Sequence, residues 1–160
     1  MRFFASRVLA LLIGGTASAS AQASADTASV QAFYQRWFGS VSQGPERYSS
    51  FYAVDGVILP PNLPAARGRA AIAEWLRNSQ AAATHVTRPT GLSVDEMRFL
   101  SPSLVLHRTT LRGERTPKSG GAAEPFATRY IDLLQKTPDG SWEVLYRIWN
   151  ETGPDPIRPP

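Results

Sequence analysis

The fold of this chain is decided by residues 51–76, whose sequence is FYAVDGVILPPNLPAARGRAAIAEWL. Within it, the apolar run Val57-Ile58-Leu59 predicts a short strand, and Asp55-Gly56 predicts a turn before that strand. Three prolines follow between residues 60 and 64. Because proline cannot donate to a sheet ladder, we expect the strand to end there, at the rim of a pocket.

Helical patterns lie on both sides of this strand. Asp26 or Thr27 can cap a first helix, and Gly44-Pro45 should end it and open a second, short one. A third helix is predicted from Arg69 to about Ala83, after Gly68. The apolar stripe of the first helix has helical spacing and consists of Val30, Phe33, Tyr34, Trp37, Phe38 and Val41.

Strand patterns replace helical ones after His85. Four strands are predicted, at Thr87–Phe99, Ser103–Arg115, Pro125–Thr137 and Ser141–Asn150. Helices that come first and a run of antiparallel strands that follows are typical of an α+β fold.

The N-terminus has the pattern of a secretory signal peptide over residues 1–23. Arg2 and Arg7 flank a short apolar run, and small residues follow with cleavage signals ending at Ala21 and Ala23. We therefore expect a periplasmic or secreted bacterial protein, with a domain over residues 24–151 and an extended tail over 152–160. A membrane anchor is the alternative, but the apolar run is too short to span a bilayer. We therefore expect no membrane association after cleavage.

The composition excludes several classes of function. Removal of Arg2 and Arg7 would lower the net charge from +4 to about +2, and no long basic run exists, so nucleic acid is not an expected partner. The chain has no cysteine, which excludes disulfides, thiol catalysis and thiolate metal sites. The only histidines are His85 and His107, so we expect no metal site. No cofactor is implied.

The last two predicted strands are apolar on both faces. An antiparallel sheet with one wet face should alternate between apolar and polar residues. One face should therefore lie under the helices, and the other should be buried in a homodimer. Alternatively, a tail or loop of the same chain covers this second face.

Four segments together resemble the nuclear transport factor 2-like superfamily, in its SnoaL-like, ketosteroid-isomerase-like branch of small bacterial domains. They are the aromatic second helix, YAVDGVILPP, RGRAAIAEWL and DGSWEVLYRIWNE, and the resemblance covers about Ser29 to Glu151. It implies a cone-shaped, curved antiparallel sheet wrapped around three N-terminal helices, with an internal cavity. It also implies a homodimer through the outer sheet face. The fold hosts isomerases, cyclases, dehydratases and plain binding domains, so it does not specify a function.

The resemblance argues against one familiar reaction. Ketosteroid isomerases use a carboxylate base just after the first strand, with a tyrosine and a protonated aspartate as donors. Here the base position falls at Leu59 or Pro60, which cannot take a proton. The isomerase tyrosine falls near Arg36, with Tyr34 and Trp37 beside it.

Other acid/base groups are His107, Asp132 and Tyr146. His107 is the one candidate for a histidine base, since its pKa range suits that role. Alternatively, His107 has only a structural role within its strand. These three residues are the weak catalytic candidates; the catalytic residues themselves stay unknown.

The polar side of the cavity depends on which strand face points inward. Arg129, Arg147 and Trp149 share a parity, and Arg147 should lie opposite Ile131. If this parity faces the cavity, two guanidinium groups would favour an anionic or carboxylate-bearing ligand. The opposite assignment places Asp132 and Tyr146 inside. A structural ion pair of Arg129 or Arg147 with Glu151 is a third possibility.

The apolar side of the cavity should be formed by Tyr34, Trp37, Tyr52, Leu59 and Trp75. Three hypotheses follow from the sequence. The first is an exported domain that binds a small, partly apolar molecule. The second is a cofactor-independent isomerase, cyclase or dehydratase, and the third is a dimeric assembly domain with a vestigial pocket.

Overall fold

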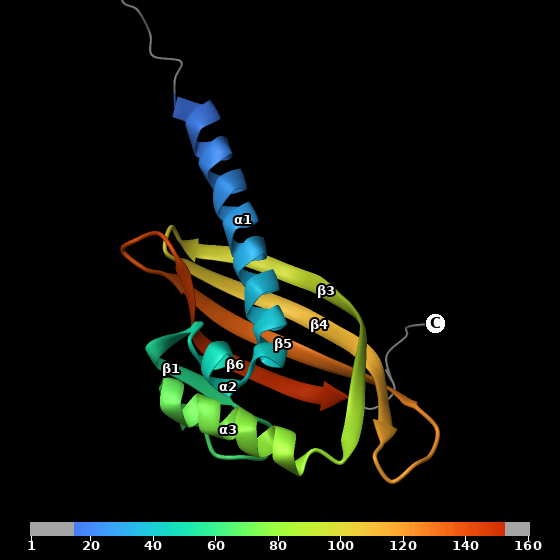
Figure 1. Cartoon of the computed structure of the whole chain (residues 1–160). Coiled ribbons are helices and arrows are strands. Elements are labelled where there is room, and N and C mark those ends of the chain that lie inside the picture. The colour runs from blue at the N-terminus through green and yellow to red at the C-terminus, as the bar shows by residue number, and fades with distance from the viewer. Residues whose placement is uncertain (1–14, 153–160) are drawn as a thin grey trace, which may run out of the picture. The chain divides into compact units, whose positions relative to one another are not determined.

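The computed structural model describes residues 15–152 (Figure 1), with side chains from Ser24 to Glu151. The chain divides into two compact units, Met1–Gln35 and Arg36–Pro160. The predicted start of the signal peptide and the tail from residue 153 lie outside the described residues. The signal peptide therefore stays a prediction.

Helix α1 spans Gly15–Gly39, so the prediction that Asp26 or Thr27 caps the first helix is wrong. Both residues lie inside the helix, because the alanine-rich sequence before them contains no breaker and favours helix. The predicted cleavage sites at Ala21 and Ala23 also lie within α1. No described helix is long and apolar enough to cross a membrane.

Two further helices of the second unit begin where the sequence predicts. A 3₁₀ turn, Ser40–Gln43, ends at Gly44, whose φ of 108° is accessible to glycine, and α2 spans Pro45–Ser49. Helix α3 spans Arg69–Ala82 after Gly68, which has a φ of 81°. Glycine and proline therefore set these boundaries as expected.

The sheet of the second unit has six strands in the order β2-β1-β6-β5-β4-β3. Figure 1 shows its curvature, with α2 and α3 beside β1 and β6. All neighbours are antiparallel except β1 and β6, which are parallel. The predicted α+β fold with a curved, largely antiparallel sheet is confirmed. The strands are β1 Tyr52–Leu59, β2 Ala66–Arg67, β3 His85–Ser101, β4 Leu104–Pro117, β5 Glu124–Lys136 and β6 Trp142–Thr152.

Strand β1 begins earlier than predicted. Asp55 and Gly56 lie inside it, so the predicted turn is wrong. They coincide with a register shift against β6 between Tyr52 and Val57. A Cβ at Gly56 would lie 2.9 Å from the carbonyl oxygen of Val144, so this irregularity allows the two strands to approach closely.

A β-bulge in β6 decides which side chains share a face. Leu133 pairs with Tyr146, whereas Leu134 pairs with Val144, so Leu145 is the extra residue. The prediction that Arg147 lies opposite Ile131 is therefore wrong: Arg147 pairs with Asp132. We call the face that carries Asp132, Leu134, Val144 and Arg147 the inner face. All four of these side chains are buried.

The opposite, outer face keeps apolar residues in partial contact with solvent. Ile131 and Ile148 are a cross-strand pair, each 45% exposed, and Tyr146 is 40% exposed. In the single chain, the described residues leave this patch uncovered. The predicted burial of this face in a dimer is therefore an untested expectation.

Candidate functional site

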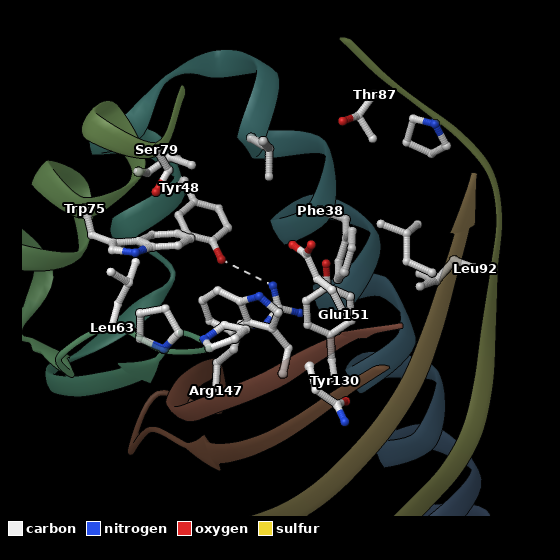
Figure 2. Close-up of a pocket in the computed structure, with 18 of the residues that line it drawn as sticks. Phe38, Tyr48, Leu63, Trp75, Ser79, Thr87, Leu92, Tyr130, Arg147 and Glu151 are labelled. Atoms are coloured by element: carbon white, nitrogen blue, oxygen red, sulfur yellow. Dashed lines mark hydrogen bonds between the residues drawn. The ribbon is translucent and has the colours of Figure 1, made fainter. Parts of the chain in front are cut away.

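A pocket of about 1210 Å³ lies in the second unit, over the inner face (Figure 2). Its walls come from α2, α3, the proline loop after β1, and the first half of β3. Most of its lining is aromatic or aliphatic, and the lining side chains include Tyr48, Trp75, Leu92, Tyr130, Arg147 and Trp149. The predicted rim is thus a rim in the structure, because the prolines at 60 and 61 line this pocket.

Arg147 forms the charged floor of the pocket. Its Nε donates to Oδ1 of Asp132 at 2.7 Å, and its Nη2 donates to Oδ2 at 3.1 Å. The two side chains are 6% and 0% exposed. Such a two-pronged pair fixes the plane of the guanidinium and neutralises its charge.

Aromatic rings hold the same guanidinium from both sides. Its Cζ lies 4.1 Å from the ring centroid of Trp37 and 4.2 Å from that of Tyr130. Cation–π contacts of this kind strengthen when the site is desolvated. Arg147 is therefore a rigid part of the site rather than a mobile surface cation.

Tyr48 connects this floor to a buried hydrogen-bond relay. Its hydroxyl accepts a hydrogen bond from Nη1 of Arg147 at 3.2 Å (dashed in Figure 2). The hydroxyls of Tyr48 and Tyr52 lie 2.8 Å apart. Tyr52 is fully buried, and burial raises the pKa of its phenol well above the usual range. Tyr52 therefore keeps its proton.

The direction of the relay follows from the partners of Tyr52. Among the described residues, the only hydrogen-bond partner of its hydroxyl is Tyr48, and a buried O–H that donates nowhere is costly. We infer that Tyr52 donates to Tyr48. The Tyr48 oxygen then accepts from both Tyr52 and Arg147, which leaves its own O–H to donate into the pocket.

His107 lies one strand beyond Asp132 on the inner face, and the two residues are a cross-strand pair. It is 1% exposed. Burial lowers the pKa of its imidazole, opposed by the charge of Asp132 and supported by that of Arg147. His107 is therefore neutral in the folded protein near pH 7.

The lowered pKa of His107 predicts a pH dependence of stability. Unfolding restores its ordinary pKa of about 6.5, so below that pH the unfolded chain binds a proton that the folded chain refuses. The free energy of unfolding should therefore fall as the pH is lowered from 7.5 to 5. Urea denaturation of the wild type and of His107→Gln at both pH values checks this. A pH dependence that is equally steep in His107→Gln would contradict it.

The structure brings some of the predicted ligand-binding residues together at the pocket. Trp75, Arg147 and Trp149 line it, and the two tryptophan rings meet edge to face at 5.2 Å. Trp37 and Tyr52 are fully buried beneath it, each in ring contact with Tyr48.

The other predicted residues lie elsewhere. Arg129 and Tyr146 are on the outer face. The bulge removes Arg129 from the face of Arg147, and Tyr146 directly precedes Arg147 on β6 and therefore faces the other way. Leu59 is 37% exposed and does not line the pocket. Tyr34 belongs to the N-terminal unit.

The three weak catalytic candidates are outside the pocket lining. Tyr146 faces outward, and His107 and Asp132 are buried below the surface of the inner face. Within residues 24–151, no three histidine, aspartate or glutamate side chains cluster as metal ligands.

Sequence reasoning missed Tyr48, Tyr130 and Glu151 as pocket residues. Tyr48 could have been found, since it shares one face of the predicted second helix with Tyr52. Tyr130 and Glu151 could not, because their inward orientation depends on the pairing of β5 with its neighbours.

Several solved structures share this fold. A ketosteroid isomerase-like protein from Erwinia carotovora atroseptica is 23% identical, with a TM-score of 0.69 over 79% of this chain and 96% of that chain. A hexachlorocyclohexane dehydrochlorinase, LinA-type3, from Novosphingobium barchaimii is 16% identical, with a TM-score of 0.67 over 86% and 96%. ActVI-ORFA from Streptomyces coelicolor is 19% identical, with a TM-score of 0.61 over 78% and 96%.

These likenesses show that the chain has the fold of the nuclear transport factor 2-like superfamily, as the sequence resemblance implied. No protein-family model and no curated protein matches the sequence. Structures with this fold include a named enzyme and a domain of unknown function, so the fold alone does not identify the reaction or the ligand.

Proposed function

We propose that the protein binds a small, partly apolar molecule that presents an acceptor oxygen, such as a carbonyl, to Tyr48. One observation carries this proposal: an aromatic pocket of about 1210 Å³ has, at its floor, a tyrosine whose hydroxyl accepts from Arg147 and lies 2.8 Å from the hydroxyl of Tyr52. Apolar walls with a few oriented polar groups are typical of small-molecule sites.

The charge at the floor favours a neutral group at this point. Arg147 is paired with Asp132 through two hydrogen bonds, so the pair has no net charge. A free anion would gain little attraction from it and would lose its hydration. The sequence-based expectation of two arginines facing an anion therefore does not apply to this part of the pocket.

Replacement of Tyr48 by phenylalanine tests the donor. We expect Tyr48→Phe to weaken binding of the bicyclic ketone 1-tetralone by about 3- to 10-fold, the value of one neutral hydrogen bond. Binding of tetralin, the hydrocarbon of the same shape without the oxygen, should change by less than about twofold. Isothermal titration of both compounds measures the difference. Equal losses for the two compounds would contradict the assignment of Tyr48 as the donor.

Two variants of α3 locate the binding in the pocket. Ser79 lines the pocket and Asn78 beside it is exposed. Ser79→Trp should fill the cavity and abolish binding of both compounds, whereas Asn78→Trp should bind as the wild type does. If the wild type binds neither compound, the proposal fails for this ligand class.

An isomerase-type enzyme is the second candidate, and Glu151 favours it. Among the described residues that line the pocket, Glu151 is the only carboxylate. A carboxylate base and a tyrosine donor in one pocket can move a proton next to a carbonyl. In that reaction Glu151 would take a proton from the α-carbon, Tyr48 would stabilise the enolate oxygen, and the proton would return to carbon.

Deuterium exchange separates this enzyme from a binding protein. In D₂O, an enzyme of this type should exchange the C2 protons of 1-tetralone faster than buffer does, as NMR measures. Glu151→Gln should abolish the exchange and leave 1-tetralone binding intact. Exchange at the buffer rate with the bound ketone would refute the enzyme and retain the binding function.

We further propose that the outer face forms a homodimer. A second copy would cover Ile131, Tyr146 and Ile148, which are 40–45% exposed in one chain. Ile148→Asp should then convert a dimer into a monomer in analytical ultracentrifugation, since it places an unpaired charge in the interface. Val54→Asp, at an exposed position of β1, is the matched control. A wild-type monomer would refute the dimer.

Export through a signal peptide is part of the same proposal. Its support is the charged, apolar and small-residue order of residues 1–23. Mass spectrometry of the protein from its host should find a mature N-terminus near residue 22 or 24. An intact N-terminus would refute export.

A further inference from the structure

A second, smaller recess of about 360 Å³ lies beside the main pocket, between the end of α3, the start of β3, and the adjoining parts of β4 and β5. The two cavities share four lining residues: Thr87, Leu111, Tyr130 and Glu151. A molecule in the main pocket can therefore extend into the recess along the inner face.

Arg115 distinguishes this recess from the rest of the inner face. It lines the recess, and its Nε is buried with no hydrogen-bond partner among the described residues. Among the described residues, the acid within ion-pair distance is Glu124, at 4.0 Å, with a side chain that is 62% exposed. That separation is too long for a hydrogen bond, and an exposed ion pair contributes little.

The contrast with Arg147 shows which arginine suits an anion. Arg147 is neutralised by the buried, two-pronged contact with Asp132, whereas the one ion pair of Arg115 among the described residues is the 4.0 Å contact with Glu124. A buried guanidinium N–H that lacks an acceptor is costly. A carboxylate oxygen in the recess would supply that acceptor.

Other side chains make the recess suitable for a polar head. His85 and Thr128 line it, and Thr128 is 4% exposed. Phe126 forms an apolar side wall, and its ring occupies the space above Gly113, where a Cβ would lie 2.6 Å from the ring. The recess thus has a guanidinium, a hydroxyl and an imidazole group beside an apolar wall, and the carboxylate of Glu151 lies at its boundary with the main pocket.

We propose that the recess binds the carboxylate head of an elongated ligand, with Arg115 as its anchor and the apolar body of the ligand in the main pocket. Along β4, Arg115 lies four residues from the shared residue Leu111, which is roughly 13 Å of strand. A medium-length alkyl chain covers that distance. This inference depends on the proposed function only for the apolar body.

Octanoate and 1-octanol test the recess, because they share an alkyl chain and differ in the head group. Binding is measured by isothermal titration with the full chain. The wild type should prefer octanoate. Arg115→Gln should weaken octanoate binding by roughly tenfold, the value of one charge-assisted hydrogen bond, and leave 1-octanol binding unchanged. Arg112→Gln, at an exposed position on the same strand, should change neither.

The outcomes separate this inference from the proposed function. Equal weakening of both ligands by Arg115→Gln, or no weakening of octanoate, would overturn the recess as a carboxylate site. Binding of 1-octanol that Ser79→Trp abolishes would still support the main pocket. If octanoate does not bind the wild type, the recess is not a carboxylate site. If 1-octanol also does not bind, that result counts against the proposed function as well.

Discussion

Asp132→Ala is expected to lower the free energy of unfolding by about 3–5 kcal/mol, the usual cost of breaking a buried ion pair. The substitution leaves the guanidinium of Arg147 buried without its carboxylate, between the rings of Trp37 and Tyr130. The Arg147 side chain is 6% exposed, so little water reaches the charge and most of the desolvation cost remains. Urea denaturation at pH 7, followed by circular dichroism, measures the loss.

A double-mutant cycle separates the pair from its surroundings. Replacement of both partners, in Asp132→Leu with Arg147→Met, removes both charges and should cost less than the sum of Asp132→Leu and Arg147→Met. A single Asp132→Ala loss below about 1 kcal/mol would show that Arg147 is hydrated or re-paired in solution. The floor of the pocket would then not be the buried Arg147–Asp132 pair.

Deletion of Leu145 is expected to leave the inner face intact. Leu145 is the extra residue of the bulge, and without it β6 would alternate strictly. The residues that would then still share the inner face are Trp142, Val144, Arg147 and Trp149. The buried core and the ion pair of Arg147 should therefore both be kept.

Leu145→Ala is the matched control, because it keeps the extra residue and removes only part of a half-buried side chain. We expect each variant to lower the free energy of unfolding by about 1–2 kcal/mol and to retain 1-tetralone binding. Urea denaturation and isothermal titration measure both properties. Loss of the cooperative transition or of binding in the deletion variant alone would show that the bulge itself is needed to set the inner face.

Local signals predicted the starts of α2 and α3 correctly. Gly44-Pro45 and Gly68 mark the starts of α2 and α3. Both glycines have a positive φ, and Pro45 stands at the first helical position, where no N–H is required. The hairpin at Asp139-Gly140 forms as expected, with Gly140 at a φ of 85°. Each of these outcomes depends on the conformations that a few adjacent residues allow.

The failures share a different cause. Asp55-Gly56 has the composition of a turn, yet pairing with β6 keeps it inside β1. Likewise, nothing in the sequence around Leu145 distinguishes a bulge from a regular strand. Whether a residue is inserted into a ladder depends on the partner strand and on what each face must bury.

The sequence by itself determined the α+β fold, the order of its helices and long strands, and the prolines after β1 that line the pocket, because those features follow from local backbone preferences and hydrophobic periodicity. Only the tertiary structure decided the site. The sequence left two alternatives for the inward-facing residues of the last strands: Arg129 with Arg147, or Asp132 with Tyr146. The bulge at Leu145 makes both wrong, because it places Asp132 and Arg147 together on the inner face. A one-residue shift in a ladder exchanges the faces of a strand, and the energy that decides it comes from long-range burial and pairing of charges.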